Sequence, residues 1–423
     1  MIVPGAVSDR PTGRRAPVWT GVRIVPLLGP AFVAAIAYVD PGNIATNLTA
    51  GATLGYTLVW VVVMASLVAI LVQFQAAKLG MATGRSLSEL CRQRFGRWGN
   101  RVLWLQAEIV VLATDLAEFV GAAIGLRLLF GMPVAASAGV TAVLSLLLLE
   151  LRRHGRTRPF ELASAAALVL VGAGVGYDIV FAGHQSAEGL VSGLMPSLAG
   201  DGALLLAMGI VGATVMPHAV YLHSALVQGR GISTEAANQH PILVRRILRL
   251  DCSLALGLAT VINVSMIALG AGLGAATGGA WTGDLVAAHG ELATRIGGAA
   301  ALAFAIALLS SGVSSAGIGT LAGDVVMQGF LGRRVPVHVR RIVTMAPAVL
   351  ALLAGAPLTG LLVLSQVVIS LGVPVALFLL VHFCRDRTLM GPLTNAPLTT
   401  AIAATAAAVV ALLACSLPLT LLL

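Results

Sequence analysis

Uncharged apolar runs recur along this 423-residue chain and constrain its fold more than any other feature. Examples are the runs 58–71, 140–149, 163–175, 299–309 and 401–413. A soluble domain gathers such residues in one core, whereas a chain with 58% hydrophobic and 10% charged residues has too little polar surface to face water. About 20 predominantly apolar residues are enough for a helix to cross a bilayer. The pattern therefore predicts an all-α integral membrane protein.

Windows of this length predict eleven transmembrane helices. No Pro-rich or Ser-rich linker separates them, so residues 23–423 are expected to form a single transmembrane domain. Residues 1–22 are expected to form a disordered cytoplasmic tail. The predicted helices lie at about 24–54, 56–80, 101–128, 133–151, 159–182, 201–229, 249–274, 297–325, 339–356, 358–383 and 397–421.

The formal net charge of +9 could suggest a nucleic-acid partner, but the placement of the arginines argues against one. Of 25 arginines, 23 lie in the tail and in the loops on one side of the predicted membrane, and only Arg127 and Arg295 lie on the other. By the positive-inside rule, the N-terminus is expected in the cytoplasm and, after eleven crossings, the C-terminus outside. We expect a multi-pass protein of a bacterial cell (inner) membrane, surrounded by lipid, with no nucleic-acid partner and no obligatory protein partner.

Two predicted helices, five helices apart, are interrupted at mid-span by helix-breaking residues. The first carries the sequence DPGN at 40–43, and the sixth carries ATVMPH at 213–218. This spacing is typical of two five-helix repeats of opposite topology, because an odd number of crossings inverts the second copy. We place the repeats at about 23–182 and 201–383, with an extra helix at about 397–421. Since broken backbone in a membrane must face protein or a water-filled cavity, both interruptions should meet at one central site.

The first interruption offers oxygen ligands and negative charge. Pro41 has no N–H, so the carbonyl of Ala37, one turn earlier, loses its helical donor. Asp40 adds a carboxylate and Asn43 an amide oxygen, which together suit a cation. These two residues could instead merely cap the helix halves. An aspartate at mid-membrane costs about 2.5–3.5 kcal/mol, which is a large penalty for a cap alone, so a cation site is favoured.

The second interruption adds a soft ligand. Pro217 leaves the Ala213 carbonyl without its helical donor, and Met216 can turn its thioether toward the first interruption. A methionine is usually a core residue, but sulfur among oxygens favours late divalent transition metals over Ca²⁺ and Mg²⁺. Gln366, within the apolar run 361–369, could complete the coordination shell, although an interhelical hydrogen bond explains it equally well.

Three acids lie on one face of the third predicted helix. Separations of seven and three residues put Glu108, Asp115 and Glu118 on the same side. Acids inside a membrane are functional by default, so a subset of them is expected to conduct protons. His218 can also exchange protons near neutral pH. The alternative is that the acids form structural ion pairs with arginines such as Arg340 or Arg341, near the start of the ninth helix.

Together these segments resemble the Nramp family of proton-coupled divalent metal transporters. Besides the two interruptions, the resemblance includes TDLAEF at 114–119, YLHS at 221–224 and GDVVMQG at 323–329. It covers the chain from about Arg23 to the end of the tenth helix or beyond. One tetrapeptide would be a weak signal, whereas these motifs in combination are highly specific.

The resemblance implies a LeuT-like fold and proton-driven import of Mn²⁺ or Fe²⁺ by alternating access, with Co²⁺, Cd²⁺ and Zn²⁺ tolerated. These ions are transported substrates, so no cofactor is expected. Many relatives have Asn where this chain has Ala219, which affects fine selectivity, and some have a twelfth helix that this chain lacks. The resemblance places these residues at the metal: Asp40, Asn43, Met216 and the carbonyls of Ala37 and Ala213, with Gln366 joining in some states. It assigns proton handling to Asp40, Asp115, Glu118 and His218. It also implies that Glu108 and Arg341 belong to a polar network between helices three and nine.

The main alternative is a LeuT-fold symporter of an amino acid or another small organic solute. Asp40 would then bind Na⁺ or an amine, but such a site gains little from the thioether of Met216. A membrane enzyme would need a nucleophile with a base or a closed metal shell, and neither is visible. The sequence therefore predicts a secondary active transporter and not an enzyme.

Overall fold

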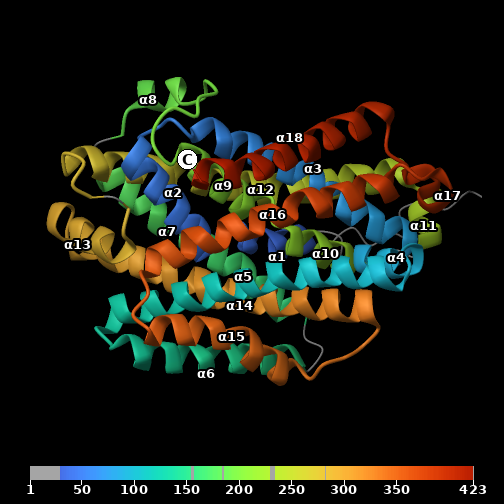
Figure 1. Cartoon of the computed structure of the whole chain (residues 1–423), viewed down its shortest axis with the longest axis horizontal. Coiled ribbons are helices and arrows are strands. Elements are labelled where there is room, and N and C mark those ends of the chain that lie inside the picture. Colours follow the sequence, from blue (N-terminus) through green and yellow to red (C-terminus); the bar gives the residue numbers. More distant parts are fainter. Residues whose placement is uncertain (1–28, 154–156, 183–184, 229–233, 282, 423) are drawn as a thin grey trace, which may run out of the picture.

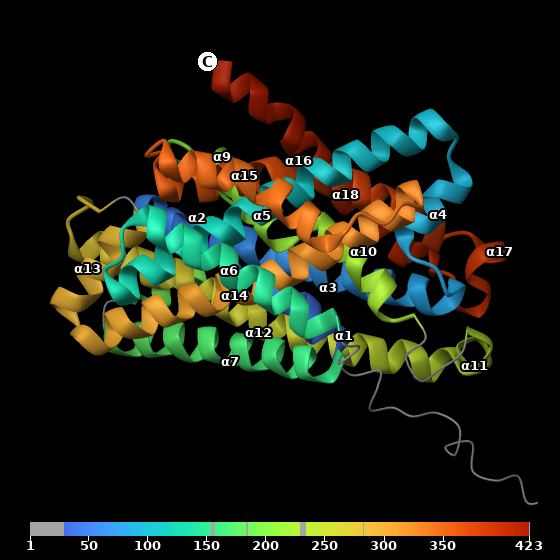
Figure 2. The ribbon, with the colours of Figure 1, turned by 90° about the horizontal axis from the view of Figure 1, so that it is seen from below.

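The computed structural model describes residues 29–153, 157–182, 185–228, 234–281 and 283–422. The predicted tail and the first residues of the first predicted span lie outside these ranges. The described residues form helices joined by short connections, with no strand among them. Figure 1 shows the long helices lying roughly alongside one another in a single bundle, and Figure 2 shows the same bundle from below.

Seven helical segments in the described part of the chain are long and apolar enough to cross a membrane. The remaining predicted spans correspond to the interrupted pair α1 and α2 and to α6, α7 and α15, so each of the eleven predicted spans matches a helical segment. The seven segments are α3 (Val59–Thr83), α5 (Arg97–Phe130), α9 (Ala203–Thr214) with α10 (Pro217–Leu226), α12 (Pro241–Ala276), α14 (Gly298–Leu331), α16 (Leu358–Cys384) and α18 (Pro397–Leu422). The others are α1 (Pro30–Ala37), α2 (Pro41–Leu54), α6 (Val134–Arg153), α7 (Thr157–Ala182) and α15 (Val337–Leu353).

Short helices connect several of these spans. On the connections lie α4 (Leu87–Arg94), α8 (Ala187–Ser192), α11 (Thr234–Gln239), α13 (Leu285–Arg295), α17 (Arg387–Met390) and the 3₁₀ turn η3 (Gly391–Leu393). The first of them, α4, has a complete capping box, in which Ser86 and Glu89 exchange side-chain to backbone hydrogen bonds. Such caps explain why short polar segments between spans are helical.

Several predicted boundaries were wrong by one to two turns. The third span begins at Arg97 instead of 101, the seventh begins at Pro241 instead of 249, and the eighth ends at Leu331 instead of 325. Apolar windows detect only the part of a helix that lies in lipid, whereas capping residues decide where it ends. Proline suits the first position of α12, and Gly332, with φ of +66°, ends α14 in the left-handed conformation.

The centre of the bundle brings helix backbones into direct contact through glycine. A Cβ on Gly125 of α5 would lie 2.7 Å from the backbone of Leu309, and one on Gly312 of α14 would lie 2.6 Å from the backbone of Ala122. Gly51 of α2 meets α12 in the same way, 2.2 Å from the carbonyl oxygen of Ile267. Close approach at small residues is the usual means by which helices associate in membranes.

Candidate metal centre

The first interruption places Asp40 between two helix halves. Helix α1 ends at Ala37, and α2 begins at Pro41 with Asp40 as its N-cap. Asp40 Oδ1 accepts a hydrogen bond of 2.7 Å from the backbone N–H of Asn43, so the capping geometry considered as the simple alternative is present. The cap uses only one carboxylate oxygen, and the other, Oδ2, accepts a 3.2 Å bond from Gln366 Nε2. Asp40 therefore has one oxygen directed away from its cap, although the side chain is only 1% exposed.

The second interruption lies directly against the first. Helix α9 ends at Thr214 and α10 begins at Pro217, which leaves Met216 at the junction without a side-chain cap bond. Asn43 Nδ2 donates a 2.6 Å hydrogen bond to the carbonyl oxygen of Ala213, the same carbonyl that loses its helical donor to Pro217. The two interruptions therefore meet, as the repeat arrangement predicts.

Helix α16 brings Gln366 onto this junction, because two glycines leave room for it. A Cβ on Gly42 would lie 1.7 Å from Gln366 Nε2, and a Cβ on Gly212 would lie 2.0 Å from the Gln366 carbonyl oxygen. The interhelical hydrogen bond considered for Gln366 is thus present, and its acceptor is Asp40. Gln366 lies among the residues predicted for the coordination shell.

The polar atoms at the junction are better suited to bind a cation than to form hydrogen bonds with one another. Among the described residues, the amide oxygens Asn43 Oδ1 and Gln366 Oε1 are buried and have no hydrogen-bond donor. Buried polar atoms nearly always have a partner, so unpaired acceptors beside a carboxylate favour a positively charged ligand. Met216 is fully buried at the same junction and supplies sulfur. The residues present can therefore offer a dehydrated dication both oxygen and sulfur ligands.

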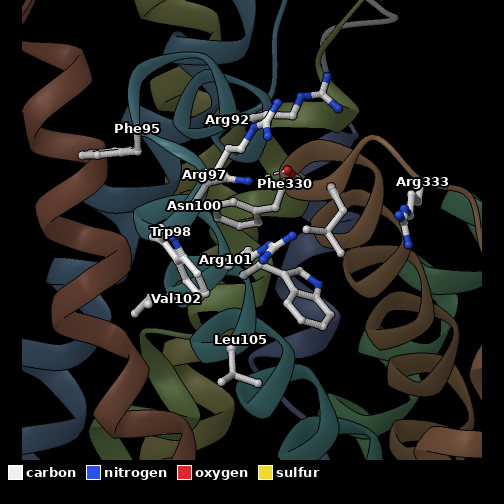
Figure 3. Close-up of a pocket in the computed structure, with 12 residues that line it drawn as sticks. Arg92, Phe95, Arg97, Trp98, Asn100, Arg101, Val102, Leu105, Phe330 and Arg333 are labelled. Atoms are coloured by element: carbon white, nitrogen blue, oxygen red, sulfur yellow. Dashed lines mark hydrogen bonds between the residues drawn. The ribbon is translucent and has the colours of Figure 1, made fainter.

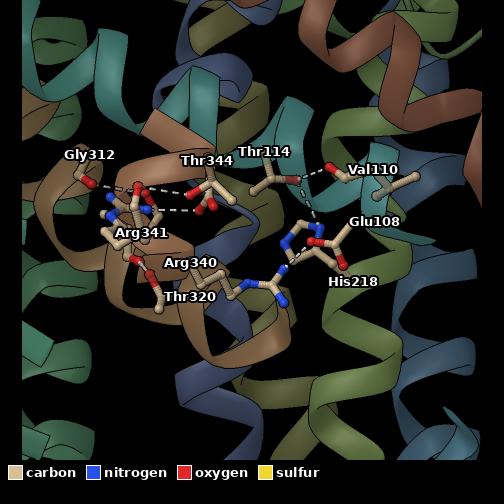
Figure 4. Close-up of polar contacts among 12 residues, drawn as sticks. Glu108, Val110, Thr114, His218, Gly312, Thr320, Arg340, Arg341 and Thr344 are labelled. Atoms are coloured by element: carbon tan, nitrogen blue, oxygen red, sulfur yellow. Dashed lines mark hydrogen bonds and ion pairs between the residues drawn. The ribbon is translucent and has the colours of Figure 1, made fainter. Parts of the chain in front are cut away.

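The acids of α5 comprise two that form ion pairs and one without a partner among the described residues; Figure 4 shows Glu108 beside Arg340. Arg340 Nη2 lies 2.7 Å from Glu108 Oε1, and Arg341 Nη1 lies 2.8 Å from Asp115 Oδ1. The ion-pair alternative is thus confirmed for these two acids. Both oxygens of Glu118, which is fully buried, have no hydrogen-bond partner in the described part of the chain.

Two glycines of α14 make space for this network. A Cβ on Gly319 would lie 2.6 Å from Glu118 Oε2 and 2.9 Å from Asp115 Oδ1. A Cβ on Gly323 would lie 2.1 Å from Arg340 Nη2, and the Gly323 carbonyl accepts a hydrogen bond of 2.5 Å from Arg340. Asp115 and Glu118 of α5 and Arg340 of α15 therefore occupy space on α14 that a larger residue than glycine would fill.

His218 connects α10 with α5. Its Nδ1 lies 3.1 Å from Thr114 Oγ1, and that hydroxyl donates to the Val110 carbonyl at 3.0 Å (Figure 4). Since the threonine has one proton, Nδ1 is the donor in this pair and Nε2 of the neutral ring is an acceptor. Nε2 is buried without a donor among the described residues, so His218 has one nitrogen available to take up a proton.

Other polar contacts around the interruptions were missed by sequence reasoning. Asp251 of α12 accepts hydrogen bonds from the backbone N–H groups of Gly29 and Ala31, at 3.1 and 3.0 Å, and so stabilises the start of α1. Gln73 of α3 donates to the Tyr38 hydroxyl at 2.6 Å, and its Oε1 lies 2.8 Å from His223 Nδ1. Each is a polar residue inside an apolar span, which is the signal that could have identified it.

Comparisons with known proteins agree on one family. The family model described as natural resistance-associated macrophage protein-like (Nramp) matches residues 31–420. A divalent metal cation transporter, MntH, of Deinococcus radiodurans is 46% identical over 373 residues, which are 88% of this chain and 85% of that protein. The MntH of Bacillus subtilis is 42% identical over 379 residues, which are 90% of this chain and 88% of that protein.

Solved structures with the same architecture extend beyond this family. A manganese transporter of Eremococcus coleocola, solved as a point mutant, matches with a TM-score of 0.82 at 28% identity, over 94% of this chain and 87% of that one. MhsT, solved in complex with L-phenylalanine, matches with a TM-score of 0.62 at 14% identity, over 91% and 98% of the two chains. The second match concerns the fold alone, and the predicted LeuT-like fold is confirmed.

Proposed function

Since the chain belongs to the Nramp family and is a divalent metal transporter, not an enzyme, we propose that it imports Mn²⁺ or Fe²⁺ together with protons through the junction of its two interrupted helices. The related proteins are named as divalent metal cation or manganese transporters. Co²⁺, Cd²⁺ and Zn²⁺ are proposed as further substrates. The metal is cargo, so its ligands must bind it selectively and then release it.

One observation carries the proposed binding site: the hydrogen bond from Asn43 to the Ala213 carbonyl joins the two interruptions at the buried carboxylate of Asp40. We assign the metal to Asp40, Asn43, Met216 and the carbonyls of Ala37 and Ala213, with Gln366 joining in some states. Carboxylate, amide and carbonyl oxygens provide charge, and the thioether disfavours Ca²⁺ and Mg²⁺. Alternating access then requires one helix group to move against the other around this site.

The amino-acid symporter considered from sequence is not favoured. The chain shares its fold with MhsT, but at 14% identity this likeness concerns architecture and not substrate. The buried thioether of Met216, at the interruption between α9 and α10, suits a transition metal and would add little to a site for an organic amine. Uptake of Mn²⁺ in parallel with uptake of amino acids separates the two functions directly.

Proton coupling is proposed to use Asp40, Asp115, Glu118 and His218, with Glu108 and Arg341 supporting the network. A dication bound near Asp40 favours release of a proton from that carboxyl group or a neighbour, because like charges repel. His218 has an unpaired ring nitrogen and Glu118 an unpaired carboxyl group, so each is suited to carry a proton. Competition between metal and proton would then couple their movements.

The membrane arrangement proposed from sequence completes this function. We propose a multi-pass protein of a bacterial inner membrane, with the N-terminus in the cytoplasm and the C-terminus outside, because the arginines lie overwhelmingly on one side. Repeat one is assigned to about 23–182, repeat two to about 201–383 and the extra helix to about 397–421. The interruptions in α1/α2 and α9/α10 support this division, since they occupy corresponding positions in the two repeats.

Replacing Asp40 tests the site. We expect Asp40→Asn to lower Mn²⁺ uptake into proteoliposomes with an imposed pH gradient by at least about tenfold, the lower range for losing support of a metal site. Asparagine is also a good N-cap, so α2 keeps its capping and the melting temperature should change little. Glu291→Ala, which removes an exposed partner of Arg295, serves as the control. Normal Mn²⁺ uptake by Asp40→Asn would refute this assignment.

Replacing Met216 tests selectivity. We expect Met216→Ala to keep the fold and to let Ca²⁺ or Mg²⁺ compete with Mn²⁺, because the remaining oxygen ligands suit those ions. Competition is measured as inhibition of Mn²⁺ uptake by an excess of either ion. Met208→Ala is the matched control, since Met208 is an equally buried methionine of α9 away from the junction. Unchanged exclusion of Ca²⁺ and Mg²⁺ by Met216→Ala would show that the thioether does not set selectivity.

A further inference from the structure

A cavity of about 680 Å³ opens at the arginine-rich end of α5, and none of its lining residues belongs to the metal centre. It lies where the start of α5 meets the C-terminal part of α4 and the end of α14. Figure 3 shows arginine side chains around it together with Trp98 and Phe330. The proposed transport mechanism gives this cavity no role.

The cavity is strongly basic. Arg92, Arg97, Arg101 and Arg333 line it, and all four side chains are exposed. In the described part of the chain, no acidic residue lines the cavity and none forms a salt bridge with these arginines. The first N–H groups of α5 add positive potential, since its N-cap, Gly96, offers no side-chain acceptor. Four cations without an acidic partner favour an anionic ligand.

The floor of the cavity holds polar atoms without partners. Asn100 is only 8% exposed, and its Nδ2 donates a 2.6 Å hydrogen bond to the Phe330 carbonyl. Its Oδ1 and the indole Nε1 of Trp104 are buried and have no partner among the described residues. One is an acceptor and the other a donor, so a ligand with both hydroxyl groups and anionic oxygens would satisfy them.

An apolar stripe leads from the cavity along the outside of α5. Trp98, Val102, Leu105 and Ile109 follow one another at helical spacing and are 77%, 65%, 54% and 47% exposed. The guanidinium of Arg101 lies 5.4 Å from the centre of the Trp98 ring. Tryptophan beside arginine is typical of the boundary between lipid headgroups and hydrocarbon. The residues of the cavity are therefore of the kind found at headgroup level, with apolar side chains suited to acyl chains beside them.

We propose that this cavity binds the headgroup of an anionic phospholipid from the leaflet on the arginine-rich side. The arginines would hold the phosphodiester, Asn100 and Trp104 would contact the polar part of the headgroup, and the acyl chains would lie along Trp98, Val102 and Leu105. Basic pockets between transmembrane helices are suited to such headgroups. A soluble phosphate would satisfy the arginines but would leave the adjoining apolar stripe without a role.

Native mass spectrometry of the full-length protein tests this proposal. The protein would be titrated with phosphatidylglycerol or with phosphatidylcholine, which carries the same phosphodiester but no net charge, and a third sample would receive inorganic phosphate alone. The variant is Arg97→Gln/Arg101→Gln, and the control is Arg385→Gln/Arg387→Gln, which removes equal charge from exposed arginines outside the cavity. Melting temperatures of all proteins would be recorded without added lipid.

The wild type and the control are expected to retain one phosphatidylglycerol in preference to phosphatidylcholine. The cavity variant should bind it about thirtyfold more weakly, from the usual contribution of two basic residues near a charged membrane surface. Equal retention of both lipids, or equal loss of phosphatidylglycerol in both variants, would overturn the proposal. Binding of inorganic phosphate with the same arginine dependence, without preferential lipid retention, would assign the cavity to a soluble anion instead.

Discussion

Arg341→Ala is expected to destabilise the protein by about 3–5 kcal/mol, the usual cost of removing one partner from a buried ion pair. Arg341 and Asp115 lie 2.8 Å apart, and their side chains are 0% and 1% exposed. Without the guanidinium, the carboxyl group of Asp115 would lose its ion-pair partner in a site that water does not reach. Thermal unfolding of the purified protein in detergent measures the change as a large fall in melting temperature.

A double variant separates stability from function at this pair. We expect Asp115→Leu/Arg341→Met to recover most of the lost stability, because apolar residues of similar volume often replace a buried ion pair without cost. Mn²⁺ uptake should nevertheless remain low if the network handles protons. Glu108→Ala, at the partly exposed pair with Arg340, should destabilise less than Arg341→Ala. Full stability of Arg341→Ala alone would contradict this view of the buried pair.

Gly212→Ala is expected to abolish most Mn²⁺ uptake and to cost about 1–3 kcal/mol of stability, the usual range for overpacking. Its Cβ would lie 2.0 Å from the Gln366 carbonyl oxygen and 2.7 Å from the backbone nitrogen of Ser370. These are backbone atoms, so no side-chain rotation relieves the clash and α9 must move away from α16. That movement would shift the Ala213 carbonyl of α9 relative to Asn43, Asp40 and Gln366.

Gly257→Ala is the matched control for this substitution. Gly257 lies inside α12, and a Cβ there would meet no atom within 4 Å. The change should leave transport intact and raise stability by up to about 1 kcal/mol, since alanine is the better helix former. Melting temperature and initial uptake rate are measured for both variants. Equal behaviour of the two alanine variants would mean that the contact between α9 and α16 does not position the site.

The sequence predicted the membrane fold well because the bilayer imposes one dominant constraint on it. The number of spans follows from the length of the apolar segments. The two helix interruptions follow from Pro41 and Pro217, and the need of broken backbone for polar partners explains why the interruptions meet. The ends of α5, α12 and α14 were missed because they lie beyond the apolar windows. There, local capping decides where a helix stops, as at Gly332.

The sequence showed which predicted helices carry polar side chains, but it did not show which residues those side chains contact. The sequence placed Glu108, Asp115 and Glu118 on one face of a helix, but it could not show that two of them pair with arginines and the third does not. Asp251 lies inside an apolar span, but the sequence does not show that it stabilises the start of α1 from another helix. Such partners depend on how distant helices cross, and helical periodicity carries no information about crossings.

The glycine positions of α14 also limit how the protein can change shape. Gly319 and Gly323 leave room on α14 for the carboxylates of Asp115 and Glu118 and for the guanidinium of Arg340, whereas the turns on either side of this glycine pair carry side chains. Sliding α5 or α15 along α14 by one turn would bring these polar groups against the side chains of residues such as Ala316 or Val326. These three helices should therefore travel together as a rigid frame, and the displacement that opens the site to one side of the membrane must be taken up by the interrupted helices.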